Sequence, residues 1–242
     1  MNDIVERRLA LSHMYVAFIA FILACFMGEY QVLERSGLIS ALDSPTVYFA
    51  SVSTHGVLMA YVLTTFFIMG FGYYTASTSL KVPVWNRPLA WGGFGLALFG
   101  TILAAIPLLL GLASVMYTFY PPAQAHYLFY LGATLLIVGS WVWCGIMIVM
   151  FVQWKKANPG EAVPLAMFAT TMNALLWLWT SAGVALESLF LIVPWSLGWT
   201  DTIDPGLART LFAWTLHPIV YFWLIPAYIA FYVFVPKQAG AF

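Results

Sequence analysis

Charge is the scarcest property of this chain. Only 7% of its 242 residues are Asp, Glu, Lys or Arg, whereas 63% are hydrophobic, and the mean hydropathy is +0.91. Soluble globular domains carry about 25% charged residues. A soluble fold of this size has no way to cover so much apolar surface. The sequence therefore predicts an integral membrane protein.

The chain also lacks an excess of either charge, a cysteine framework and the short alternating segments of a β-barrel. Nine basic residues balance nine acidic ones, which disfavours a nucleic-acid partner. The two cysteines, Cys25 and Cys144, both lie in apolar segments, where packing is the expected role. The apolar stretches run far beyond the ~10 residues of a barrel strand. Helices are therefore the expected spanning elements.

Six apolar stretches reach the length of about 20 residues that a helix needs to cross a bilayer. Pro, Gly, Asn and Asp residues separate them. No linker is long enough to divide the chain. The expected class is all-α and polytopic, with one transmembrane domain over residues 1–242. The expected spans are 9–33, 47–74, 89–116, 127–154, 165–195 and 207–234.

The basic residues predict the orientation. With the N-terminus in the cytoplasm, only Arg35 and Arg209 fall on the outer side. Cytoplasmic loops of membrane proteins are enriched in Lys and Arg. The sequence therefore predicts a cytoplasmic N-terminus. The seven residues then placed inside are Arg7, Arg8, Lys81, Arg87, Lys155, Lys156 and Lys237.

Ionisable side chains inside the spans are costly to keep and therefore mark candidate sites. His55, followed by Gly56, suits an axial haem ligand, because imidazole supplies a nitrogen and glycine leaves room for the macrocycle. The alternative is a histidine that bonds a hydroxyl on the next helix. Glu187 has apolar neighbours on both sides. It is a candidate proton acceptor or gate, or else a structural hydrogen-bonding group.

Two further groups of span residues are expected to be structural. His13 and Glu29 lie toward opposite ends of the first span, where either can reach the interface by snorkelling or capping. The run WGGFGLALFG predicts close helix approach. Its glycines are Gly92, Gly93, Gly95 and Gly100.

The last span carries the sharpest pattern. His217 and Tyr221 are four residues apart, so they share a helix face. Tyr228 and Tyr232 follow at offsets of 11 and 15 from the histidine, close to whole helical turns. The stripe is either a proton path or an aromatic packing seam. Prolines 218 and 226 would free backbone carbonyls along it.

The stretch HPIVYFWLIPAY, residues 217–228, resembles the sixth-helix signature of haem–copper oxidase subunit I. The resemblance implies that His217 ligates copper B. It also implies that Tyr221 is the tyrosine cross-linked to a copper-ligating histidine, which gives an electron and a proton during O–O cleavage. THGVLMA is similar to the low-spin haem motif of the family, which assigns His55 to haem iron.

Other stretches look like the B-type branch of that family: YTFYPP at 117–122, VALESLFLIVPWSLG at 184–198, DPGLARTLF at 204–212 and VPKQAG at 235–240. In that branch Glu187, Tyr228 and Tyr232 match positions of proton handling and of a single K-type uptake path. Isoleucine at 219 stands where other branches have glutamate. The resemblance implies a prokaryotic plasma membrane and an activity that reduces O2 to water while moving protons.

The family's subunit has about a dozen spans, so the resemblance covers its N-terminal half. It implies a low-spin haem of b-type, a high-spin haem of a- or o-type, and copper B, with the other ligands supplied from outside this chain. The implied partners are the C-terminal half, a copper A subunit II and a cytochrome c-like donor. Two positions depart from the B-type pattern, namely Leu216 in place of glycine and Ala213 in place of tryptophan.

Three other functions stay open. A nitric oxide reductase shares the ancestry but normally lacks the cross-linking tyrosine, so Tyr221 argues against it. A non-catalytic remnant or structural subunit of a membrane redox complex is favoured by Leu216 and by the missing half. A bis-histidine cytochrome b is disfavoured, because the helices lack histidine pairs at haem-spanning spacing.

Overall fold

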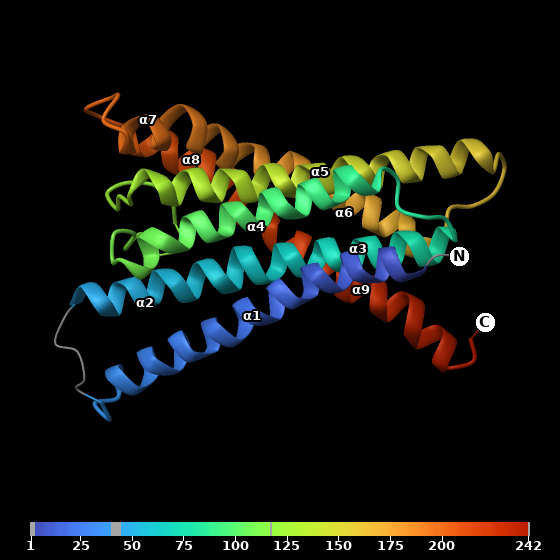
Figure 1. Cartoon of the computed structure of the whole chain (residues 1–242), viewed down its shortest axis with the longest axis horizontal. Coiled ribbons are helices and arrows are strands. Elements are labelled where there is room, and N and C mark those ends of the chain that lie inside the picture. The colour runs from blue at the N-terminus through green and yellow to red at the C-terminus, as the bar shows by residue number, and fades with distance from the viewer. Residues whose placement is uncertain (1–2, 40–44, 117, 242) are drawn as a thin grey trace.

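The computed structural model describes residues 3–39, 45–116 and 118–241. Tyr117, the first residue of YTFYPP, lies outside them. Long helices run back and forth along one axis and form an elongated bundle (Figure 1). Their bounds are α1 Asp3–Arg35, α2 Pro45–Val57, η1 Leu58–Leu63, α3 Thr64–Leu80, α4 Arg87–Leu109, α5 Tyr127–Ala157, α6 Leu165–Glu187, η2 Ser188–Ile192, α7 Val193–Ser196, α8 Pro205–Leu216 and α9 Pro218–Gln238, where η marks a π-helix.

Six helical stretches of the described chain are long and apolar enough to cross a bilayer, which confirms the expected all-α, six-span class. The second span combines α2, η1 and α3. The fifth combines α6, η2 and α7, and the sixth combines α8 and α9. The stretches are Glu6–Arg35, Pro45–Leu80, Arg87–Leu109, Tyr127–Ala157, Leu165–Ser196 and Pro205–Gln238.

The expected end of the third span at residue 116 is wrong, because α4 ends at Leu109. Gly111 adopts a φ of +70°, and the amide of Leu112 donates to the carbonyl of Pro107 at 2.8 Å. This pair of features is the Schellman C-cap, which a glycine in the left-handed region allows. The apolar residues after Gly111 leave the helix, and Ala113 forms an isolated antiparallel bridge with Ala125.

Both termini and the α3–α4 and α5–α6 connections lie at the same end of the bundle (Figure 1). The basic residues of four helices therefore lie at one end: those in the first turns of α1 and α4, and those in the last turns of α5 and α9. Lys81 caps α3 there in a left-handed conformation, with a φ of 55°. The seven basic residues that the sequence groups together thus share one end, as alternating spans require.

Small residues bring α4 and α5 close together. Gly93 and Gly100 face α5, where a Cβ on Gly93 would lie 2.9 Å from the side chain of Val142. A Cβ on Gly139 of α5 would lie 2.8 Å from the Cβ of Ala97. Such contacts bind helices in the membrane by close van der Waals packing. The same expectation is wrong for Gly92 and Gly95, where an added Cβ meets no atom within 4 Å.

Candidate functional site

His55 lies near the end of α2, half-buried against α1. Its Nδ1 is 2.8 Å from the backbone oxygen of Ala24. Because a carbonyl oxygen only accepts, Nδ1 carries the proton and donates. The other ring nitrogen, Nε2, therefore keeps its lone pair and makes no hydrogen bond within the described residues. A hydrogen bond at Nδ1 fixes the tautomer and the direction of Nε2, which is the usual arrangement of a metal-ligating histidine.

The seat of the His55 ring is made by two small residues of α1. Gly28 follows Ala24 by one helical turn, and a Cβ on Gly28 would lie 2.9 Å from Cε1 and 3.1 Å from Nδ1 of His55. Only glycine leaves room for the ring in this position. Neither residue was predicted from the sequence as part of the site. The small residues four apart at 24 and 28 are a spacing typical of close helix contacts in membranes.

His217 and Tyr221 come together as the sequence predicts. Nε2 of His217 lies 3.2 Å from the hydroxyl oxygen of Tyr221, and the ring centroids are 5.4 Å apart. The histidine sits at the junction between α8 and α9, and both side chains are exposed. Since Nε2 faces the phenol, Nδ1 is the nitrogen left for a metal ion. Leu216 and Ala213 are also exposed beside this pair.

A buried threonine holds the end of α8 against α6. The hydroxyl of Thr215 donates to the carbonyl of Thr180 at 2.6 Å and accepts from the amide of Val184 at 2.9 Å. Thr215 is 3% exposed, so both bonds form away from solvent. Buried hydrogen bonds of this kind are costly to break. They fix the backbone two residues before His217.

Pro226 frees a carbonyl in α9, as the sequence predicts. Proline has no N–H, so the carbonyl of Phe222 loses its partner four residues on. The side-chain amide of Asn173 donates to that carbonyl at 3.1 Å. The ring of Trp177, one turn along α6 from Asn173, stacks on Phe222 with centroids 4.5 Å apart. Together these contacts bind α9 to α6 just beyond Tyr221.

Tyr228 and Tyr232 lie on the same exposed side of α9 as Tyr221. Their exposed fractions are 49% and 70%. No hydrogen bond links these tyrosines to one another within the described residues. The stripe therefore exists as a row of exposed phenols, and its use as a proton path remains a prediction.

Glu187 is fully buried at the last position of α6, where the helix passes into η2. Neither carboxyl oxygen has a hydrogen-bond partner within the described residues, and the same holds for the hydroxyl of Ser188. An ionised group buried without partners is energetically costly, which marks Glu187 as a candidate functional residue rather than a packing residue. π-Helical turns occur often at functional sites. These observations do not support the structural hydrogen bond that was the alternative.

The expectation that His13 reaches the interface is wrong. It is 1% exposed and donates from Nδ1 to the carbonyl of Leu9 at 2.8 Å. Its ring packs edge-on against Phe94, with centroids 4.7 Å apart, and lies 5.3 Å from that of Tyr73. Aromatic residues from α3 and α4 surround it, which the sequence of α1 alone does not reveal. Glu29, by contrast, is exposed.

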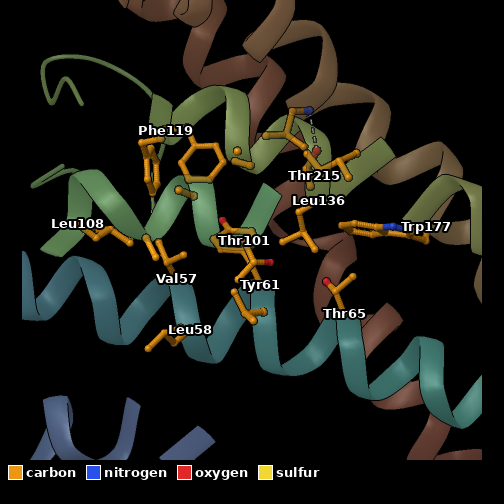
Figure 2. A pocket seen from close by; sticks show the side chains of 18 residues that line it. Val57, Leu58, Tyr61, Thr65, Thr101, Leu108, Phe119, Leu136, Trp177 and Thr215 are labelled. Atoms are coloured by element: carbon orange, nitrogen blue, oxygen red, sulfur yellow. Dashed lines mark hydrogen bonds between the residues drawn. The ribbon is translucent and has the colours of Figure 1, made fainter. Parts of the chain in front are cut away.

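A small apolar cavity of about 50 Å³ lies between η1, α4 and α5. Figure 2 shows Tyr61 of η1 close to Thr101 of α4, with Thr215 at the far side of the cavity. A cavity of only ~10–15 Å³ already has room for one water molecule. Apolar walls favour a small uncharged molecule over an ion. The cavity borders the residue that fixes the end of α8.

No group of three or more His, Cys, Asp or Glu residues in the described ranges lies close enough to hold a metal ion. Neither His55 nor His217 therefore belongs to a group of three such residues within the described ranges. The residues present fit partial sites, since each histidine has one nitrogen oriented by a neighbour and one nitrogen left.

A bundle of six helices that can span a membrane, with two histidines oriented by neighbouring groups, defines a polytopic membrane protein with candidate metal ligands. The chain belongs to the family described as "Cytochrome C and Quinol oxidase polypeptide I", whose model matches residues 8–241.

A similar curated protein is cytochrome c oxidase subunit 1 of Thermus thermophilus, which is 38% identical over 241 residues. The match covers 97% of this chain and 43% of that protein. A solved cryo-EM structure of a heme-copper terminal oxidase dimer superposes with a TM-score of 0.91 at 41% identity. The superposition covers 96% of this chain and 40% of the oxidase chain. The chain thus spans less than half the length of these relatives.

Proposed function

We propose that this chain is the N-terminal half of the catalytic subunit of a respiratory terminal oxidase that reduces O2 to water and translocates protons. The observation that carries the proposal is the contact between His217 and Tyr221 at the α8–α9 junction, 3.2 Å between Nε2 and the phenol oxygen. A redox-active phenol beside a metal-ligating imidazole suits the cleavage of O2. The family and the relatives named above support the same activity.

His55 is proposed to ligate the iron of a low-spin haem, of b-type, through Nε2. Ala24 fixes the tautomer by accepting the Nδ1 proton, and Gly28 leaves room for the ring. His217 is proposed to ligate copper B through Nδ1. When bound, the low-spin haem would supply an electron-transfer centre, and a high-spin haem of a- or o-type with copper B would supply the chemistry of O2 reduction. The remaining ligands would come from the C-terminal half.

Protons are proposed to reach Tyr221 along Tyr232 and Tyr228, whose phenols line one side of α9. Hydroxyl groups can both donate and accept a hydrogen bond, so a row of them with water can relay protons. Glu187, at the end of α6, is proposed to take up and release a proton, because its buried oxygens have no competing partner in the described chain. The apolar cavity beside η1 suits an uncharged substrate such as O2.

The working assembly is proposed to contain the C-terminal half, a copper A subunit II and a cytochrome c-like donor. It would lie in a prokaryotic plasma membrane, as a single transmembrane domain with its N-terminus in the cytoplasm. The seven basic residues at one end of the bundle support this orientation. Tyr221 favours an oxygen reductase over a nitric oxide reductase. The remaining alternative is a non-catalytic subunit, which Leu216 and the limited share of the relatives' length favour.

Tyr221→Phe tests the role of the phenol. We expect the assembled complex to keep its bound metals but to lose oxygen turnover to background, since phenylalanine fills the same space without a hydroxyl. Oxygen uptake and copper content of the purified complex measure the two effects. Tyr127→Phe is the matched control, because Tyr127 is the first residue of α5 and its hydroxyl makes no hydrogen bond within the described residues. Normal turnover in Tyr221→Phe would refute the role.

A further inference from the structure

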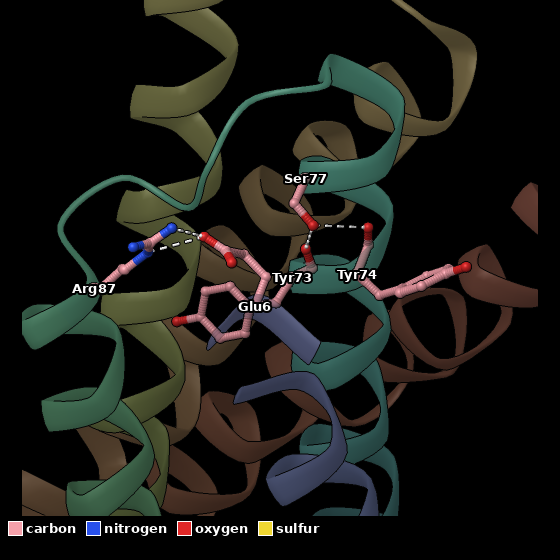
Figure 3. Close-up of polar contacts among 5 residues, drawn as sticks. All are labelled: Glu6, Tyr73, Tyr74, Ser77 and Arg87. Carbon is pink, nitrogen blue, oxygen red and sulfur yellow. Dashed lines mark hydrogen bonds and ion pairs between the residues drawn. The ribbon is translucent and has the colours of Figure 1, made fainter. Parts of the chain in front are cut away.

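A second cavity, distinct from the one beside η1, opens where the start of α1 meets the end of α3. It measures about 840 Å³ and is lined by Glu6, Arg7 and Leu11 of α1, by Tyr74 and Ser77 of α3, and by Arg87 of α4. This volume lies within the range of small-ligand sites, ~300–1,000 Å³. Figure 3 shows the Glu6–Arg87 pair beside the turns of α3 that carry Tyr74 and Ser77.

Two arginines give this cavity a positive charge. Arg87 donates to Glu6 from Nε at 2.9 Å and from Nη2, which orients its guanidinium. A guanidinium has five N–H donors, so three remain. Arg7 is exposed and makes no ion pair within the described residues. The two guanidinium charges and the single carboxylate charge leave the cavity lining with a net positive charge. The excess favours an anion, and arginine binds phosphate oxygens well.

An apolar stripe leads from Arg7 along α1. Leu11, Tyr15, Phe18 and Ile22 follow it at helical offsets of 4, 8, 11 and 15, so all lie on one face. Three of them are exposed, at 63% for Tyr15, 51% for Phe18 and 53% for Ile22. A cation at the end of an apolar stripe matches the shape of a phospholipid. Because α1 is long and apolar enough to cross the bilayer, its exposed apolar face is expected to lie among acyl chains, and the anions at its end are then lipid headgroups.

We propose that this cavity binds the phosphate group of an anionic phospholipid, with an acyl chain lying along the α1 stripe. Arg7 and Arg87 donate to the phosphate oxygens, and Glu6 positions Arg87. The apolar run of α1 begins at Leu9, so Arg7, two residues before it, lies at the headgroup end of the first span. Basic pockets between membrane helices are known to recognise such headgroups. This site is separate from the histidines of the proposed function.

The test compares Arg7→Gln with Arg8→Gln in the complete complex. Arg8 is exposed on the same turn but does not line the cavity. Both variants therefore lose the same surface charge. The probe is a photoreactive phosphatidylglycerol in phosphatidylcholine vesicles, with the labelled peptides mapped by mass spectrometry. We expect labelling of α1 and α3 peptides to fall roughly fivefold in Arg7→Gln and to stay at the wild-type level in Arg8→Gln.

Three results would overturn the proposal. Equal labelling in the two variants would mean that only the general surface charge attracts the lipid. Equal labelling by a photoreactive phosphatidylcholine would mean that the arginines do not select an anionic headgroup. Absence of label from wild-type α1 and α3 would mean that another protein segment covers them. Thermal unfolding of each complex shows that the variants are folded, and the haem spectrum separates this test from that of the proposed function.

Discussion

Replacing His217 with alanine is expected to reduce oxygen turnover to background while the low-spin haem spectrum of the assembled complex survives. The variant removes the imidazole that faces Tyr221 but leaves Thr215 and Asn173 to fix the helices around it. The proposed low-spin ligand, His55, lies on a different span. Oxygen uptake, copper content and the reduced-minus-oxidised spectrum measure turnover, bound copper and the low-spin haem separately.

His126→Asn is the matched control for this variant. His126 caps α5 by accepting from the amide of Leu128 at 3.3 Å, and asparagine keeps a capping oxygen. The control therefore removes an imidazole without touching α8 or α9, and turnover should persist. Loss of the low-spin haem signal together with turnover in His217→Ala would mean that the histidine stabilises the fold. Full activity would exclude it as a metal ligand.

Gly28→Ala is expected to disturb the low-spin haem without unfolding the bundle. A Cβ at this position would lie 2.9 Å from Cε1 of His55, and the free end of that side chain is the part able to move. Moving the ring breaks its alignment with the carbonyl of Ala24, which fixes the tautomer. Loss of such a supporting contact typically weakens metal binding ~10–100-fold. Haem content and the electron paramagnetic resonance signal of the low-spin haem report the effect.

Gly145→Ala is the control for this second prediction, because an added Cβ there meets no atom within 4 Å. Alanine in a helix interior is intrinsically favoured over glycine by ~1 kcal/mol. The control should therefore be at least as stable as the original protein, with unchanged haem spectra. An unaltered low-spin signal in Gly28→Ala would contradict the proposal that α1 orients the His55 ring for haem binding.

The six spans and the His217–Tyr221 pair were predictable from the sequence because each follows from a local rule. A bilayer requires about 20 apolar residues per helix, and residues four apart share a helix face. The carbonyl freed by Pro226 follows equally from the missing N–H of proline. The end of α4 was predictable as well. Gly111 carries a helix-stop signal that the apolar residues after it concealed.

Other features depend on which helices become neighbours. His13 is buried because rings from α3 and α4 pack on it, and nothing within α1 specifies those partners. The seat of His55 combines a carbonyl and a glycine of one span with an imidazole of the next. The partner of the Phe222 carbonyl is Asn173, 49 residues away. Such pairings need the tertiary structure.

The most direct test of the proposed oxidase is a dithionite-reduced minus oxidised spectrum of the complex isolated through a tag on this chain, recorded with and without carbon monoxide. We predict a low-spin haem band together with a second haem whose spectrum shifts with carbon monoxide, because a partner supplies the ligands that the described chain does not. A folded, membrane-inserted complex without haem bands would contradict the account and make this chain a structural subunit.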